Sequence, residues 1–107
     1  MSGIQRRSCY RVQYPSGEGP TMQMSKGVYP VIDLSEGGLS FSTDVGQFLT
    51  GEVYNLKLHF KDGEQFSSSA EVVRLSAKSV SLRLSTEVPY RKIVAEQLRL
   101  KNSYPNI

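Results

Sequence analysis

The feature that most constrains the fold is a repeated alternation of apolar and polar residues within short segments. Over 54–60, every second residue is tyrosine, leucine or phenylalanine, and the residues between them are Asn, Lys and His. The same two-residue period recurs over 39–43 and 80–84. This period is typical of a strand with one buried and one solvated face. The sequence therefore predicts a mainly β protein of short strands.

The residues around these segments carry turn and bulge signals. Lys-Asp-Gly-Glu at 61–64 is typical of a hairpin turn between two strands. In the long segment 66–75 the apolar residues change parity near Val73, which predicts a β-bulge. Pro30, inside the strand-like run 28–34, indicates an edge position or another bulge, because proline lacks a backbone N–H.

After Pro89 the period becomes helical. Side chains suited to one helix face fall at Ile93, Val94, Gln97, Leu98 and Lys101. We expect a C-terminal helix over 88–102 that packs on the β structure through Ile93, Val94 and Leu98. An apolar surplus on that face would form a homodimer or partner surface. Residues 1–5 are expected to be flexible, and 103–107 to be a tail.

The length of the chain fits one domain, residues 1–107. Hydrophobic residues make up 38% and charged residues 21%, which is the composition of a folded chain. Six or so short antiparallel strands must close on themselves or cover their edges. We therefore predict an all-β fold: a six-stranded antiparallel barrel with the C-terminal helix at one open end.

Composition also excludes several classes of function. The net charge of +3 permits an anionic ligand but lacks the dense basic stripe of a polynucleotide binder. A single cysteine, Cys9, excludes an internal disulfide and a multi-cysteine zinc site. With one histidine, His59, and no catalytic triad, P-loop or metal-ligand spacing, we predict no enzyme, metal or cofactor. No apolar run suggests a signal peptide or membrane span, so a cytoplasmic location is expected.

Two polar clusters remain to be explained. The first contains Arg6, Arg7 and Arg11, with Tyr10 among them. A guanidinium group is planar and always charged, so it can grip phosphate, stack on a base, or bind the O6 and N7 acceptors of guanine. Taken alone, however, a basic N-terminus is more typical of a solvated segment.

The second cluster lies at a strand-to-strand corner and contains Asp33, Ser35, Gly37 and Gly38. The Asp33 carboxylate can accept hydrogen bonds from guanine N–H groups, and the Ser35 hydroxyl can donate or accept. Gly37 and Gly38 allow positive φ and bring backbone N–H groups close to a ligand. Taken alone, this cluster is better interpreted as an ordinary Asx-type hairpin turn.

Together the clusters form a recognisable pattern. Arg-x-x-x-Arg, followed 22 positions after Arg11 by Asp-x-Ser-x-x-Gly, resembles the PilZ domain, the bacterial receptor module for cyclic di-GMP. The surrounding residues agree, including the Arg-Arg pair and Val-Ile-Asp-Leu-Ser-Glu-Gly-Gly-Leu at 31–39. The resemblance covers nearly the whole chain. The two motifs are specific in this order and spacing, whereas either one alone is weak.

The resemblance implies a six-stranded antiparallel barrel with a C-terminal helix and cyclic di-GMP lying across its surface. The arginines that match Arg7 and Arg11 contact the phosphates and guanines of the ligand. The positions that match Asp33, Ser35 and Gly38 complete the pocket.

The residue before the first motif, here Arg6, influences whether one ligand or an intercalated pair is bound, and arginine is compatible with the pair. Without ligand, the charges of Arg6, Arg7 and Arg11 repel, so we expect the segment to be mobile. A ligand with two phosphates would order it against Asp33 and change a surface for an unknown downstream protein. Motility, biofilm or polysaccharide control is typical of the family.

Two other interpretations stay open. A small barrel could bind single-stranded nucleic acid through its basic and aromatic residues. A PilZ-like adaptor could bind protein and ignore nucleotide, although the intact motifs argue against it. The sequence leaves the partner, the oligomeric state and the ligand stoichiometry undetermined.

Overall fold

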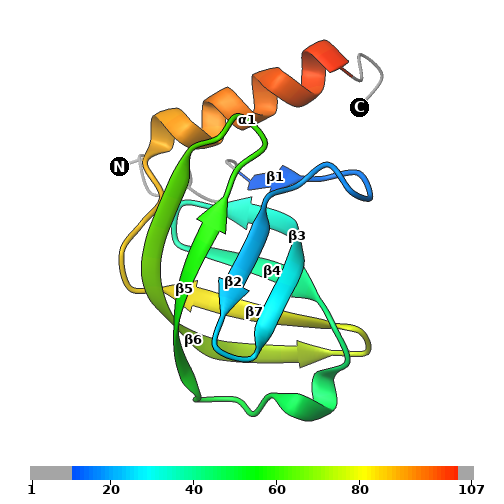
Figure 1. Cartoon of the computed structure of the whole chain (residues 1–107), viewed down its shortest axis with the longest axis vertical. Coiled ribbons are helices and arrows are strands. Elements are labelled where there is room, and N and C mark those ends of the chain that lie inside the picture. Colours follow the sequence, from blue (N-terminus) through cyan, green and yellow to red (C-terminus); the bar gives the residue numbers. More distant parts are fainter. Residues whose placement is uncertain (1–10, 104–107) are drawn as a thin grey trace, which may run out of the picture.

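A computed structural model of the chain describes residues 11–103, apart from the side chain of Val45, as strands around one core with a helix at one end (Figure 1). The strands are β1 (Arg11–Gln13), β2 (Thr21–Met24), β3 (Gly27–Ser35), β4 (Gly38–Ser42), β5 (Val53–His59), β6 (Gln65–Ser76) and β7 (Ser79–Leu84). One turn of 3-10 helix, η2 (Val45–Gln47), follows β4, and the α-helix is α1 (Tyr90–Ser103).

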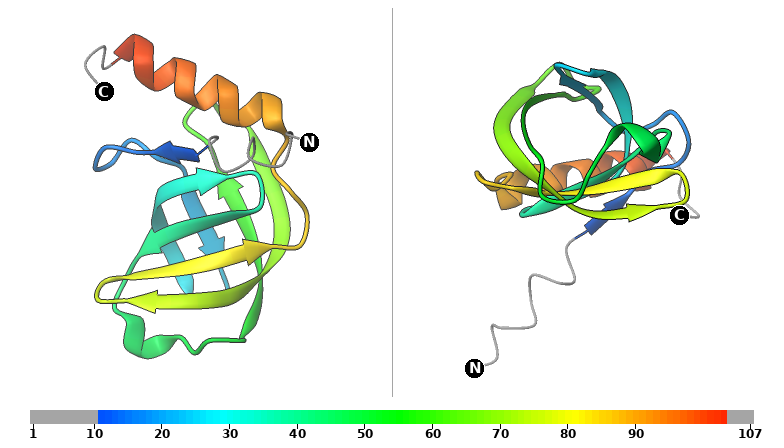
Figure 2. Two further views of the ribbon diagram at one scale, coloured as in Figure 1. Left: turned by 180° about the vertical axis from the view of Figure 1, so that it is seen from behind. Right: turned by 90° about the horizontal axis from the view of Figure 1, so that it is seen from below.

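Six of these strands form a closed antiparallel barrel. They pair in the order β3, β2, β5, β6, β7 and β4, and the pairing of β4 with β3 closes the ring, which is seen end-on in Figure 2. The short β1 is an additional strand that pairs with the end of β3. The predicted fold, a six-stranded antiparallel barrel with a C-terminal helix, is confirmed.

The core follows the two-residue period of the sequence. In β5 the side chains of Leu56 and Leu58 are buried, and so is that of Phe60 directly after the strand. Lys57, between the two leucines, is exposed. The largest fully buried side chains include Phe41 and Phe48, whose rings meet edge to face with centroids 5.4 Å apart. Burial of such side chains supplies most of the stability of a small barrel, because each removes a large apolar surface from water.

The predicted turn and bulges are present. Gly63 has a φ of 95° in the β5–β6 turn, where the Phe60 N–H donates to the carbonyl of Glu64 over 2.9 Å. In β6 the register with β7 shifts between Val72 and Arg74, so Val73 is the extra residue. A second irregularity interrupts the β3–β4 pairing just after Pro30, between 31 and 33.

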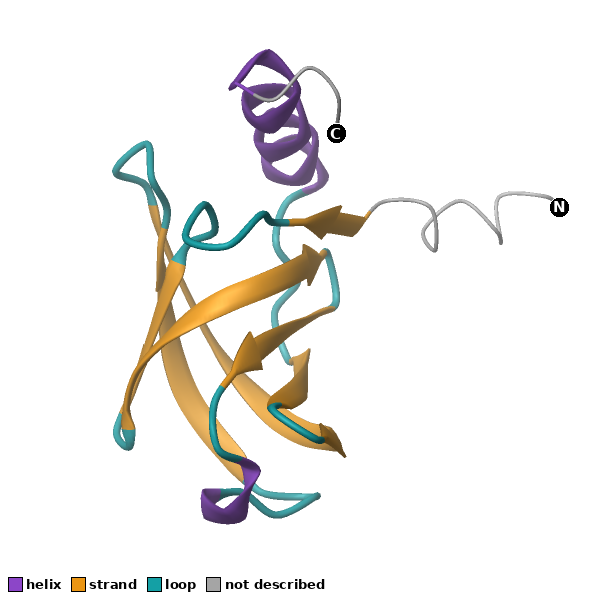
Figure 3. Cartoon of the chain, turned by 90° about the vertical axis from the view of Figure 1, so that its right-hand side faces the viewer, coloured by secondary structure: helices purple, strands orange, loops and turns teal. Residues whose placement is uncertain are grey.

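Helix α1 covers one end of the barrel, above β1 (Figure 3). At its start the carbonyl of Pro89 accepts hydrogen bonds from the N–H groups of Lys92 and Ile93, so the helical bonding begins at Pro89. No helix among residues 11–103 has the length and apolar character needed to cross a membrane.

The buried face of α1 differs from the predicted one. Ile93 is fully buried as expected, but Leu98 is 55% exposed and Val94 is only half-buried. Two ionisable residues, Lys92 and Glu96, are buried instead. The expectation for Leu98 was wrong because polar contacts, which a search for apolar periodicity does not register, fix the rotation of the helix.

Lys92 makes the first of these contacts. Its Nζ lies 2.5 Å from Asp62 Oδ2 and 2.7 Å from Glu64 Oε1, so it joins α1 to the β5–β6 turn. It also lies 4.4 Å from the centroid of the Phe60 ring. Burial acts to lower the pKa of Lys92, but the two carboxylates outweigh it and raise that pKa overall. The two carboxylates of the β5–β6 turn therefore also help to hold α1 in place.

Glu96 makes the second contact. The Tyr14 hydroxyl donates a 2.7 Å hydrogen bond to Glu96 Oε1, and burial, together with this carboxylate, raises the pKa of Tyr14. Arg99 donates to Glu96 and, over 2.8 Å, to the carbonyl of Glu18. The residues that fix the helix through these contacts are named the helix anchor: Tyr14, Asp62, Glu64, Lys92, Glu96 and Arg99.

Candidate functional site

The acidic corner predicted between two strands is largely strand. Asp33 and Ser35 belong to β3, and the turn consists of Glu36 and Gly37 before β4 begins. The Ser35 hydroxyl donates to the carbonyl of Gly38 over 3.2 Å, which holds the two sides of this turn together. Asp33 is thus carried on a paired strand, a more rigid support than a loop.

The expectation of positive φ at the paired glycines was wrong. Among the described residues, positive φ occurs at Gly17, Gly27, Gly51 and Gly63, and not at Gly37 or Gly38.

The need for glycine at position 38 is steric. A Cβ on Gly38 would lie 2.7 Å from the carbonyl oxygen of Leu82, where β4 pairs with β7. At Gly37 a Cβ would meet the Glu87 carboxylate at an ordinary 4.0 Å.

Strand β1 brings Arg11, the last residue of the first motif, to this corner. Arg11 is paired with Ser35 and Gln13 with Asp33, so Arg11 and Asp33 are diagonal neighbours on the outer face. Arg11 Nη1 lies 2.6 Å from Asp33 Oδ1. Two residues 22 positions apart in sequence, one from each motif, therefore meet in the folded chain.

Of the predicted arginine segment, the structure describes only Arg11. This residue begins β1, because the neighbouring Val12 is 2% exposed and binds the strand to the core. Arg6 and Arg7 lie outside the described residues, so the expectation that they are mobile without ligand stays a prediction.

A pocket of about 440 Å³ lies on the outer face beside the Arg11–Asp33 pair. We name it the arginine pocket; its lining residues are Arg11, Asp33, Gly38, Leu39, Ser40, Val73, Arg74, Ser81 and Leu82. It contains two guanidinium groups and one carboxylate, so its side chains leave an excess of positive charge. Ser35 and Gly37 are nearby in the hairpin but are not among the lining residues.

Arg74 is the site residue that sequence reasoning missed. The bulge at Val73 shifts the register, so that Arg74 lies opposite Ser81 on the outer face of the sheet. Ser81 in turn shares a 3.0 Å hydrogen bond with Ser40 across β4 and β7. A parity change followed directly by arginine was visible in the sequence, and it was the signal that could have placed this charge outside the barrel.

The pocket can bind a polar anion. Arginine offers paired donors to phosphate, and Asp33 can accept hydrogen bonds from a base. The Arg11–Asp33 pair is exposed, with 46% and 22% of the two side chains accessible, so it contributes at most about 1 kcal/mol and can rearrange around a ligand. Within residues 11–103, no three His, Cys, Asp or Glu side chains are grouped as metal ligands.

Comparison with known families identifies the class of the protein. Residues 5–99 match the family model described as PilZ domain. The chain therefore belongs to the PilZ domain family, a family of binding and adaptor domains that includes receptors for cyclic di-GMP. The resemblance predicted from the two motifs is confirmed at the level of the family.

Solved structures share the fold. The Bacillus subtilis inhibitor of motility (MotI/DgrA) superposes with a TM-score of 0.67 and 18% identity over 84% of this chain and 50% of its own, so the chain spans half of that protein. The uncharacterized Legionella protein Lpg0364 gives 0.57 and 17% over 88% and 96%.

A third structure, the PilZ domain of CeSA from a cellulose-synthesizing bacterium, gives a TM-score of 0.48 and 18% identity over 84% of this chain and 92% of its own. None of the curated proteins compared with the sequence matches it significantly. At these identities MotI/DgrA and Lpg0364 establish the likeness of fold alone.

Proposed function

We propose that the protein is a receptor for cyclic di-GMP and that the ligand binds over the arginine pocket. The observation that carries the proposal is the 2.6 Å contact between Arg11 and Asp33, one residue from each motif, at the edge of a pocket with excess positive charge. Membership of the PilZ domain family supports the choice of ligand.

Each group has a role that follows from its chemistry. Arg7 and Arg11 bind the phosphates and guanine edges, and Asp33 accepts hydrogen bonds from guanine N–H groups. Because Gly38 has no side chain, the ligand can approach the β4 backbone there. Ser35 and Gly37 keep the β3–β4 hairpin in its observed conformation. Charge repulsion between the arginines in the free protein is relieved by the two phosphates.

Two further arginines extend the contact surface. Arg74 faces the pocket from β6, and within residues 11–103 it has no ion-pair partner, so its charge is available to a ligand. Arg6 supplies another guanidinium, and an arginine at this position is compatible with an intercalated pair of ligands as well as with a single one.

We further propose that binding orders the arginine segment. A partner protein recognises the altered surface, and the chain itself catalyses no reaction. Order gained on binding is a common output of small regulatory domains. The structural neighbour MotI/DgrA is an inhibitor of motility, and control of motility or biofilm formation is the process we propose here too.

Calorimetric titration with cyclic di-GMP tests the proposal. Wild type should bind with a stoichiometry of one or two, and Arg7→Ala should lose about 30-fold or more in affinity, because a charged partner is removed from a desolvated contact. Lys78→Ala, which removes an exposed cation outside the pocket, is the matched control. Equal affinity for wild type and Arg7→Ala would overturn the assignment.

Two measurements separate this function from its alternatives. Amides of residues 5–12 should gain protection from hydrogen exchange when cyclic di-GMP is added. A single-stranded oligonucleotide should compete only weakly with cyclic di-GMP. Stronger binding of the oligonucleotide would favour a nucleic-acid-binding barrel, and no binding of either would favour an adaptor that ignores nucleotides.

A further inference from the structure

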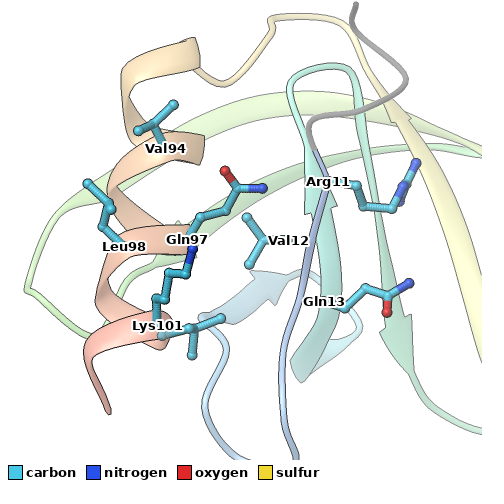
Figure 4. A pocket seen from close by; sticks show the side chains of 8 residues that line it. Arg11, Val12, Gln13, Val94, Gln97, Leu98 and Lys101 are labelled. Atoms are coloured by element: carbon cyan, nitrogen blue, oxygen red, sulfur yellow. The ribbon is translucent and has the colours of Figure 1, made fainter. Parts of the chain in front are cut away.

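A second hollow, of about 500 Å³, lies between β1 and α1 (Figure 4). It is lined by all three residues of β1 and, from the helix, by Val94, Gln97, Leu98, Leu100 and Lys101. Side chains of consecutive strand residues point in opposite directions, so a hollow that touches all three borders the edge of the strand rather than one face. We name it the β1 groove.

The edge of β1 that borders the groove is open. The Tyr14 N–H donates to the carbonyl of Ile32 over 3.0 Å, so at Tyr14 and Val12 the backbone groups point toward β3. By the alternation of an antiparallel ladder, the N–H and C=O groups of Arg11 and Gln13 point away from β3. Among residues 11–103, β1 pairs with no strand except β3.

The opposite wall of the groove has a definite chemistry. Leu98 is 55% exposed there and Val94 is half-buried, so α1 offers apolar surface. Figure 4 shows Gln97 and Lys101 on the side of α1 that faces β1, with the Arg11 guanidinium across the strand. No carboxylate is among the lining residues. The groove is therefore apolar with a cationic end.

We propose that the β1 groove binds an extended segment of a partner protein that pairs with the open edge of β1. An unpaired edge is a template for one more strand, and pockets for alternate side chains give such pairing its specificity. The segment that fits has aliphatic side chains for Val94 and Leu98 and an acidic side chain for Lys101. Three residues of β1 can pair with roughly three to five residues of the segment.

This surface is distinct from the arginine pocket, although Arg11 lines both. Its backbone faces the groove, while its guanidinium contacts Asp33. The proposal does not require cyclic di-GMP to bind, so the two assignments can fail separately. If both hold, a ligand that repositions Arg11 acts directly on the strand that holds the partner.

The test uses a phage-displayed library of random heptapeptides, selected on the full-length protein. Peptides with aliphatic residues at positions i and i+2 and an acidic residue at i+4, which share one face of an extended segment, should be enriched on wild type and not on Gln13→Pro. Proline removes an N–H that faces the groove without removing a bond to β3. Gln13→Ala keeps that N–H and is the matched control. For an enriched synthetic peptide, Lys101→Glu should weaken binding about tenfold, as measured by fluorescence anisotropy.

A second measurement protects the test against misfolding of the proline variant. Two peptide series should be compared, one methylated at the backbone nitrogens of odd positions and one at those of even positions. Only one series should lose binding, because only one edge of the segment pairs with β1. Binding that tolerates both methylated series would overturn the proposal. So would enrichment of the same peptides on Gln13→Pro, or a wild-type dimer that Gln13→Pro dissociates, which would make a second copy the occupant.

Discussion

The helix anchor and the arginine pocket both join distant parts of the chain through charged groups, but they do so in opposite ways. In the helix anchor, Lys92 has two carboxylate partners and Glu96, which is 1% exposed, is bonded to Tyr14 and Arg99. In the arginine pocket a single pair, Arg11 with Asp33, is open to solvent.

The difference separates charges that hold a fold from charges that are available to a ligand. A buried charge must be fully paired, since desolvation without a partner costs several kcal/mol, and the anchor satisfies this condition. Exposed cations in excess cost little and leave donors free. The comparison predicts that substitutions in the anchor reduce stability, whereas substitutions in the pocket reduce ligand binding.

The largest effect is expected for Glu96→Ala. It leaves the buried Tyr14 hydroxyl without its acceptor and removes the nearer of the two carboxylates that pair with Arg99, so the free energy of unfolding should fall by about 3 kcal/mol. Urea denaturation measures this. Glu87→Ala, at an exposed glutamate, should change it by less than about 0.5 kcal/mol. Equal effects of the two substitutions would remove the distinction between anchor and pocket.

The next largest effect is expected for Arg11→Ala, which should reduce ligand binding rather than stability. Affinity for cyclic di-GMP should fall about 30-fold or more, and Asp33→Ala should behave alike, because each leaves a charged partner unmatched in the complex. The free energy of unfolding should change by less than about 1 kcal/mol, since the pair is exposed. A loss of stability larger than the loss of binding energy would contradict the proposed role.

A smaller effect, about tenfold in affinity, is expected for Arg74→Ala, since Arg74 adds charge at the side of the pocket. Arg83→Ala is the control, because Arg83 is an exposed arginine on the outer face that is already paired with Glu71. Isothermal titration of both variants distinguishes a pocket residue from a general effect of net charge. Similar losses for the two variants would exclude a specific role for Arg74.

The smallest effect is a pH dependence within the anchor. The hydrogen bond from Lys92 holds the pKa of Asp62 below its ordinary value. This contribution to stability is present above about pH 4 and is lost as the pH falls through the lower, folded-state pKa. The difference in unfolding free energy between wild type and Asp62→Asn should be below about 1 kcal/mol at pH 7, because Asp62 is half-exposed, and should shrink toward pH 2.

Urea denaturation at both pH values measures this difference. Asp44→Asn, at an exposed aspartate with no ion pair within the described residues, is the control, with an expected change below about 0.5 kcal/mol. A difference for Asp62→Asn that grows as the pH falls would contradict the assignment.

Much of the barrel could be predicted because its signals are local. Alternation over 54–60 identified β5 and its buried face, and the parity change near Val73 located the bulge in β6. A period of two determines which face of a strand is buried, whatever the strand pairs with. Local patterns did not predict the contact between Arg11 and Asp33. That contact was inferred from motif resemblance, and it depends on the pairing between β1 and β3.

The errors came from interactions that local patterns do not register. Leu98 was placed on the buried face of α1 because it is apolar at the right spacing, yet Glu96 is buried in its place through Tyr14, 82 positions earlier. Gly38 was explained by backbone conformation, although a neighbouring strand, β7, imposes the requirement. Arg74 could not be assigned to the pocket until β6 and β7 were known to be neighbours.

The ring of six strands closes without β1, so the pairing of the barrel does not depend on this strand. Detaching β1 would break its three paired positions with β3 and expose Val12. The pairings among the six barrel strands would remain. A displacement of β1 would therefore move Arg11 away from Asp33 without disturbing the pairing of the six barrel strands.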